Sequence, residues 1–138
     1  MKNITYEVAP VFNFVSQFFE LNPSSNMKGI GLERDDKLIA GVLYDDWNSS
    51  NIWMHVAALP NSNWLNRDYL RACFGYPFIQ LNARRVSGWV EEDNKEARRF
   101  DEHLGFKQEA VLKKAGRFGQ DVIIYAMFKE ECRFIKGM

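Results

Sequence analysis

The stretch from Glu91 to Phe106 constrains the fold most, because both ends of a helix can be located in it. Asp93 or Asn94 can supply the oxygen that caps the first turn of this helix. Gly105 supplies the residue type that ends helices in a left-handed conformation. Between these two ends the apolar side chains recur at spacings of three and four and form one stripe: Ala97, Phe100 and Leu104.

Apolar periodicity predicts the other elements of the chain. Strands are expected at residues 4–8, 28–33, 37–44, 51–59, 84–89, 110–114 and 121–128, and helices at 11–21, within 61–82 and at 94–105. The segment 61–82 is long enough to be a crossover, so the strands at 52–58 and 84–89 should be parallel. Pro77 should kink or end the helix in that segment, and the tail from Lys129 onwards should fray.

Length and charge limit the class of protein. A chain of 138 residues fits one mixed α/β domain, 1–138. Its 18 basic and 18 acidic residues cancel, which disfavours nucleic acid as a partner. The two cysteines have no metal-ligand spacing, so no metal is expected. No stretch has the length of a membrane span and the start lacks the apolar run of a signal peptide, so we expect a cytoplasmic protein without a membrane partner.

The pattern Asn94-x-x-Ala97-x-x-Phe100, followed by Gly105 and Phe106, resembles the last conserved block of the GNAT N-acetyltransferases. The order of elements from about residue 29 to residue 128 is similar to the ribosomal-protein alanine acetyltransferase-like branch. The resemblance implies an α/β fold with a central mixed sheet of six to seven strands, flanking helices and two parallel strands that splay apart. It implies acetyl-CoA and an amine acceptor as partners, and it leaves a homodimer open.

The resemblance also implies where acetyl-CoA would bind. The first splayed strand would contact the pantetheine arm through its main chain, and the helix after the second strand would flank the arm. The implied cofactor-binding residues are His55, Val56, Ala57, Arg67, Asn94, Ala97 and Phe100. The segment Pro60–Asp68 departs from the family, because it lacks the glycines that let backbone N–H groups approach phosphates and it contains the bulky Trp64.

The catalytic position departs from the family as well. Asp101 stands where the family has the Tyr that often protonates the leaving thiolate, and an Asp can do so only if burial raises its pKa. We favour the interpretation that Asp101 is a solvated helix residue, which predicts weak activity and little effect of Asp101→Asn. Tyr69, Tyr76 or Tyr125 is an alternative acid. His55 is the candidate base, because histidine changes charge near neutral pH, although a lone His on a strand is more often a packing residue.

For the acceptor, Glu33 and Asp46, together with Asp45, are expected to face one region and bind a cationic amine, unless they are only turn residues. The hypothesis is an acetyl-CoA-dependent N-acetyltransferase acting on a primary amine, either a protein N-terminus or a small-molecule amine. The alternative is a catalytically weak or inactive GNAT-fold module with a binding or structural role.

Overall fold

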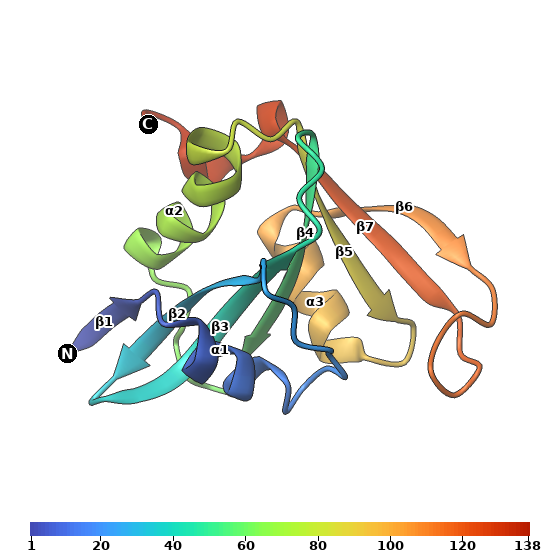
Figure 1. Ribbon diagram of the computed structural model, residues 1–138, viewed down its shortest axis with the longest axis horizontal. Helices are drawn as coiled ribbons and strands as arrows, with labels where there is room; N and C mark the ends of the chain where they lie inside the picture. Colours follow the sequence, from blue (N-terminus) through green and yellow to red (C-terminus); the bar gives the residue numbers. More distant parts are fainter.

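One mixed β-sheet organises the computed structural model, which describes residues 1–138 (Figure 1). Its seven strands lie in the order β1-β2-β3-β4-β5-β7-β6, and β4 and β5 are its parallel neighbours. The strands are β1 (Lys2–Thr5), β2 (Lys28–Arg34), β3 (Lys37–Asp45), β4 (Asn51–Ala58), β5 (Arg85–Glu91), β6 (Lys107–Leu112) and β7 (Val122–Phe128). The predicted mixed sheet of six to seven strands is therefore confirmed.

Three α-helices flank the sheet: α1 (Val8–Val15), α2 (Arg67–Gly75) and α3 (Lys95–Leu104). Alternate residues of a strand point to opposite faces, and in β4 Ala57 packs with α1 whereas Val56 belongs to the larger core that includes α2 and α3 residues. Helix α1 therefore covers one face of β2–β4, and α2 and α3 cover the other. None of the helices combines the length and the apolar character required to cross a membrane.

The N-terminal elements differ from the predicted ones. Strand β1 ends at Thr5, and α1 begins at Val8 and ends at Val15, so the predicted strand at 4–8 and helix at 11–21 are both displaced. Helix α1 lies close to the sheet because glycines face it. A Cβ added to Gly29 would lie 3.1 Å from the Val11 side chain.

Helix α2 ends at Gly75, and the chain continues as a π-helical turn over Tyr76–Gln80 that contains Pro77. The prediction that the helix is interrupted around Pro77 is confirmed. The prediction that the tail frays is wrong. Phe134 stacks on Phe74 with ring centroids 5.0 Å apart, and Cys132 is buried. Arg133 donates hydrogen bonds to the carbonyl oxygens at the end of α3, which lack partners within the helix.

The pairing of β4 with β5 creates a fork in the sheet. The two strands pair only from Asn51–Arg85 to Trp53–Ser87, although β4 continues to Ala58 and β5 to Glu91. Beyond Trp53 they diverge, as Figure 1 shows, and α3 follows directly after β5. The predicted parallel pair that splays at its C-terminal ends is confirmed.

Candidate active site

A narrow crevice of about 40 Å³ lies between the diverging part of β4 and the first turns of α3. It is lined by Phe18, Phe19, Val56, Ala57, Asn94, Glu96, Ala97 and Phe100. Five of the seven residues predicted to bind the cofactor are in this set, and His55 and Arg67 are not. The structure therefore brings together residues from β4 and α3 that lie far apart in the sequence.

The backbone of β4 beside this crevice has a strand partner on one side only. Residues Met54–Ala58 pair with β3, but their ladder with β5 stops at Trp53. Main-chain donors and acceptors without a strand partner can pair with an extended ligand, as in strand addition. This part of β4 is therefore suited to hold an amide-containing chain.

Helix α3 is positioned by the two end signals that the sequence predicts. The Asn94 side chain accepts a hydrogen bond from the N–H of Ala97 at 3.2 Å, and Gly105 has a φ of 111°. Asn94 is thus the N-cap, and this residue also lines the crevice.

Replacing Asn94 by Ala should lower the free energy of unfolding by about 0.5–2 kcal/mol, because the first turn loses its cap. Denaturant unfolding of both proteins measures this difference. Asn94→Asp is the matched control, since Asp caps about as well as Asn. Equal stability of Asn94→Ala and the parent protein would show that the hydrogen bond contributes nothing.

Asp101 is buried, which overturns the interpretation that it is a solvated helix residue. It is 6% exposed and lies beneath α3 over β5, where a Cβ on Gly88 would be 2.9 Å from its Oδ2. Burial, assisted by the negative charge of Glu102, raises the pKa of Asp101 to about 8. Gly88 follows Ser87, the last β5 residue that pairs with β4. At neutral pH, Asp101 is therefore a protonated carboxylic acid next to the fork, although it does not line the crevice itself.

His55 is on the opposite face of β4 from Val56 and forms a second group of polar side chains. Its Nε2 lies 3.5 Å from Oδ2 of Asp45, and its ring centroid lies 6.1 Å from that of Phe19. His55 shares a cavity of about 320 Å³ with four other residues: Asp45, Asp46, Trp53 and Trp89. Carboxylates and indole faces both attract a cationic amine, so this cavity is suited to bind one.

Glu33 does not belong to this group, and the expectation that it faces the same region as Asp46 is wrong. Lys28, at the start of β2, pairs with Tyr44 beside Asp45, whereas Glu33 pairs with Leu38 near the hairpin turn. The antiparallel hairpin thus separates Glu33 from Asp45 by about 20 Å along the strand.

The loop between β4 and α2 has no glycine, and asparagine residues adopt the left-handed backbone conformation in it. Asn61 and Asn63 have φ values of 56° and 57°, a left-handed conformation that Asn adopts more readily than most residues. Trp64 is buried, and its ring centroid lies 5.3 Å from that of Phe100. The Ser62 hydroxyl in the same loop is buried without a hydrogen-bond partner.

Arg67 is exposed and is the first residue of α2, outside the crevice. Asn66 caps this helix by accepting a hydrogen bond from the N–H of Tyr69 at 3.0 Å. An exposed cation at a helix N-terminus suits an anion such as phosphate. Asp68, in the same first turn, opposes it.

None of the three candidate tyrosines lines the crevice. The hydroxyl of Tyr69 donates to the carbonyl oxygen of Ile30, and the hydroxyl of Tyr125 donates to Glu102 at 2.6 Å. Arg98 donates to the same Tyr125 oxygen, so the phenol connects Arg98 with Glu102. Tyr76 lies on the α2 side of the sheet. Asp101, which lies over Gly88 of β5 and has a raised pKa, is therefore the candidate acid that we consider further.

Comparison with solved structures identifies the fold. A mutant form of the spermidine/spermine N-acetyltransferase SpeG from Vibrio cholerae matches with a TM-score of 0.71 at 15% identity, covering 94% of this chain and 96% of that chain. SpeG in complex with manganese ions matches with the same TM-score and identity, covering 94% and 93%. The chain has the GNAT fold.

A third structure, described as a probable acetyltransferase, matches with a TM-score of 0.65 at 18% identity, over 78% of this chain and 64% of that one. No protein-family model matches the chain, and the search of curated proteins found no relative. The similarity to these three solved structures supports the fold that was predicted from the sequence block around Asn94.

Proposed function

We propose that the chain is a single-domain, acetyl-CoA-dependent N-acetyltransferase that acts on a primary amine. The observation that carries this proposal is the fork between β4 and β5. The pairing of β4 with β5 stops at Trp53, and helix α3 borders the opening and carries the buried acid Asp101. The main chain at His55, Val56 and Ala57 would hold the pantetheine arm of acetyl-CoA. Asn94, Ala97 and Phe100 would flank the arm, and Arg67 would face the phosphates.

The residues that line the crevice are of types that can contact the pantetheine arm of acetyl-CoA, but the crevice is too small for the arm as it stands. A water molecule occupies about 30 Å³ in the liquid, so a crevice of about 40 Å³ holds one or two. Phe18 and Phe19 narrow it on the α1 side. Binding of the arm therefore requires these two side chains to move, and they follow a helix that ends at Val15.

The chemistry would use both sides of the fork. Asp45 and Asp46 would attract the cationic acceptor between Trp53 and Trp89, and His55 would accept the proton that the amine loses. The neutral amine would attack the thioester carbonyl carbon, a carbon–nitrogen bond would form, and the carbon–sulfur bond would break. The nitrogen, which is positively charged after the attack, would release its second proton to solvent. The protonated Asp101 would then supply the proton to the leaving thiolate, the role of the Tyr that it replaces.

Acetyl-CoA should raise the melting temperature of the protein, because a ligand at 100 times its Kd stabilises the folded state by about 2.7 kcal/mol. Thermal unfolding with acetyl-CoA, and with dephospho-coenzyme A as control, measures this. Acetylation of a panel that contains N-terminal peptides, small monoamines and spermidine then measures transfer. Preference for peptides would support the ribosomal-protein alanine acetyltransferase-like branch. No stabilisation and no acetylated product would contradict the proposal.

The alternative is a GNAT-fold module that binds a partner without turnover. The observation that favours it is Trp64, whose packing on Phe100 occupies the side of the loop toward α3. Stabilisation by acetyl-CoA without acetylation of any amine in the panel would support this alternative.

A further inference from the structure

The edge strand of the sheet leaves part of its neighbour uncovered. Strand β1 pairs with Gly31–Arg34 of β2, and its pairing ends at Thr5. The remaining residues of β2, Lys28–Ile30, pair with β3 on one side and with no strand on the other. An uncovered strand edge presents backbone donors and acceptors that another extended chain can pair with.

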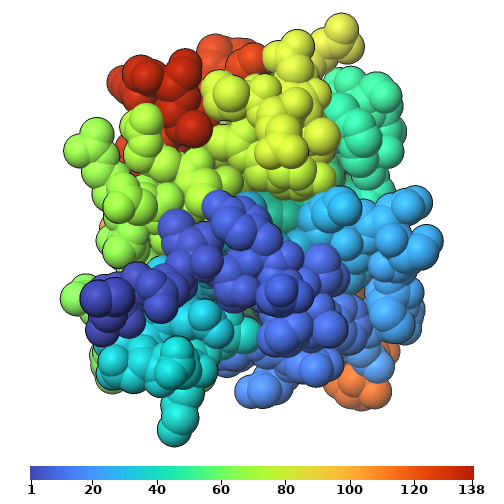
Figure 2. Space-filling model, turned by 60° about the vertical axis from the view of Figure 1, so that its left-hand side comes forward, coloured from blue at the N-terminus to red at the C-terminus, as the bar shows by residue number.

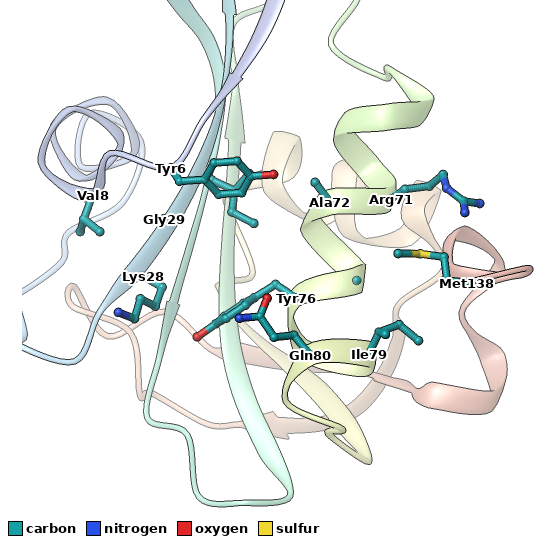
Figure 3. A pocket seen from close by; sticks show the side chains of 12 residues that line it. Tyr6, Val8, Lys28, Gly29, Arg71, Ala72, Tyr76, Ile79, Gln80 and Met138 are labelled. Atoms are coloured by element: carbon teal, nitrogen blue, oxygen red, sulfur yellow. The ribbon is translucent and has the colours of Figure 1, made fainter.

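A groove of about 570 Å³ runs along this uncovered edge. One wall is β2 and the other is α2 with the π-helical turn, and Figure 3 shows Tyr6 and Tyr76 at opposite ends of it. Figure 2 shows the N-terminal segment, α2 and the C-terminal residues meeting on this side of the molecule. The groove is lined mainly by apolar side chains, which include Val8, Ile30, Ala72, Ile79 and Met138.

The charged side chains that line the groove are of one sign. Lys28 and Arg71 line it, and no acidic side chain does. Arg71 donates one hydrogen bond to the carbonyl oxygen of Lys136 at 3.1 Å. Lys28 also borders a neighbouring cavity that contains Asp45 and Asp46. It forms no ion pair with either carboxylate, and Asp45 is paired with His55 instead, so Lys28 is available to an incoming anion.

We propose that this groove binds an extended peptide segment, with apolar side chains and one carboxylate, as an added strand on β2. Main-chain hydrogen bonds to the Lys28–Ile30 edge would supply affinity, and alternate side chains would enter the groove against α2. The Tyr69 hydroxyl already donates to the oxygen of Ile30. Since adjacent residues of a strand direct their backbone groups to opposite edges, only alternate residues of Lys28–Ile30 face the uncovered edge. The carboxylate of the peptide would pair with Lys28 or Arg71.

This site is separate from the fork. The groove lies at the β1 edge of the sheet, whereas the crevice lies between β4 and β5, and the two sets of lining residues share no member. The inference therefore does not depend on the proposed acetyl transfer, and it stands even if no amine is acetylated.

The experiment is selection of random decapeptides displayed on phage, with the whole protein as bait and Ala72→Trp as counter-bait. Ala72 is half-buried on the α2 wall, so an indole there fills the groove without removing any backbone group. We expect enriched peptides to alternate apolar residues and to carry Asp or Glu. Fluorescence anisotropy should show about tenfold or greater loss of affinity in Ala72→Trp and in Lys28→Glu.

Methylation of alternate backbone nitrogens in a selected peptide should cost about tenfold in affinity, because it removes donors to the strand edge. Melting temperatures equal to that of the parent protein would show that both variants are folded. If Ala72→Trp does not fold, Lys28→Glu is used as the only counter-bait and the only variant in the affinity measurement. The proposal is overturned if no peptide is enriched over the counter-bait. It is also overturned if N-methylated peptides bind as well as their parents. A dimer in sedimentation that Ala72→Trp dissociates would overturn it too, because a second copy would then be the occupant.

Discussion

Replacing Asp101 by Asn should slow acetyl transfer by about 10²- to 10⁴-fold, the usual contribution of a general acid. Asp101 is buried, and its pKa of about 8 keeps most of it protonated at pH 7. In the proposed reaction it would give this proton to the coenzyme A thiolate. Asn has nearly the same shape but no acidic proton. Single-turnover acetylation of the best acceptor in the amine panel, at saturating acetyl-CoA, measures the rate of the chemical step in both proteins.

The pH profile distinguishes an acid from a packing residue. In the parent protein the rate should fall as pH rises above about 8, because Asp101 loses its proton there. This limb should be absent in Asp101→Asn. Glu102→Gln is the matched control, since Glu102 is the next residue of α3 but is exposed and hydrogen-bonded to Tyr125. A fast Asp101→Asn variant with the parent's pH profile would show that the carboxyl only packs.

The burial of Asp101 could have been found in the sequence. The buried stripe of α3 consists of Ala97, Asp101 and Leu104, which are spaced by four and three residues. Sequence reasoning placed Phe100 in this stripe because it is apolar, but Phe100 is half-buried beside the crevice. Polarity alone thus assigned Asp101 to solvent, whereas helical spacing places it between two core residues.

The features that depend only on neighbouring residues in the sequence, such as the two ends of α3, were predicted correctly. The cap at Asn94 and the left-handed Gly105 both depend on a few neighbouring residues, and both are confirmed. The parallel pairing of β4 with β5 was predicted because a helical crossover between two apolar strands leaves little choice of connection, whereas the divergence of the two strands was implied by the resemblance alone. Val56, Ala57 and Phe100 meet as the resemblance implies because the positions of β4 and α3 follow from that crossover.

The errors concern contacts between elements that lie far apart in the sequence. Glu33 and Asp46 both follow apolar runs, but the antiparallel pairing of β2 with β3 sends them to opposite ends of the hairpin. Trp53 and Trp89 share the His55 cavity only because of the β4–β5 register, which no local pattern encodes. The docked tail had a visible signal in Phe134, since an aromatic side chain near a chain end favours packing.

The stability of the protein should depend on pH through Asp101, and Asp101→Asn should remove that dependence. The carboxyl has a folded-state pKa of about 8 against its ordinary pKa of 3.8, so between these values the folded chain holds a proton that the unfolded chain has lost. Its contribution is complete below about pH 4 and is lost as pH rises through about 8. The free energy of unfolding should fall by up to about 1.4 kcal/mol per pH unit within this window.

The measurement is urea unfolding of both proteins at several pH values from 5 to 9, with the difference in unfolding free energy plotted against pH. All other titrating groups are shared, so the slope of the difference reports Asp101 alone. We expect Asp101→Asn to gain stability relative to the parent protein up to about pH 8 and the difference to level off above it. Glu102→Gln should leave this slope in place, because the main cause of the shift is burial of Asp101. Parallel curves for Asp101→Asn and the parent would mean that the carboxyl is ionised throughout, and the acid role proposed for it would fall with that result.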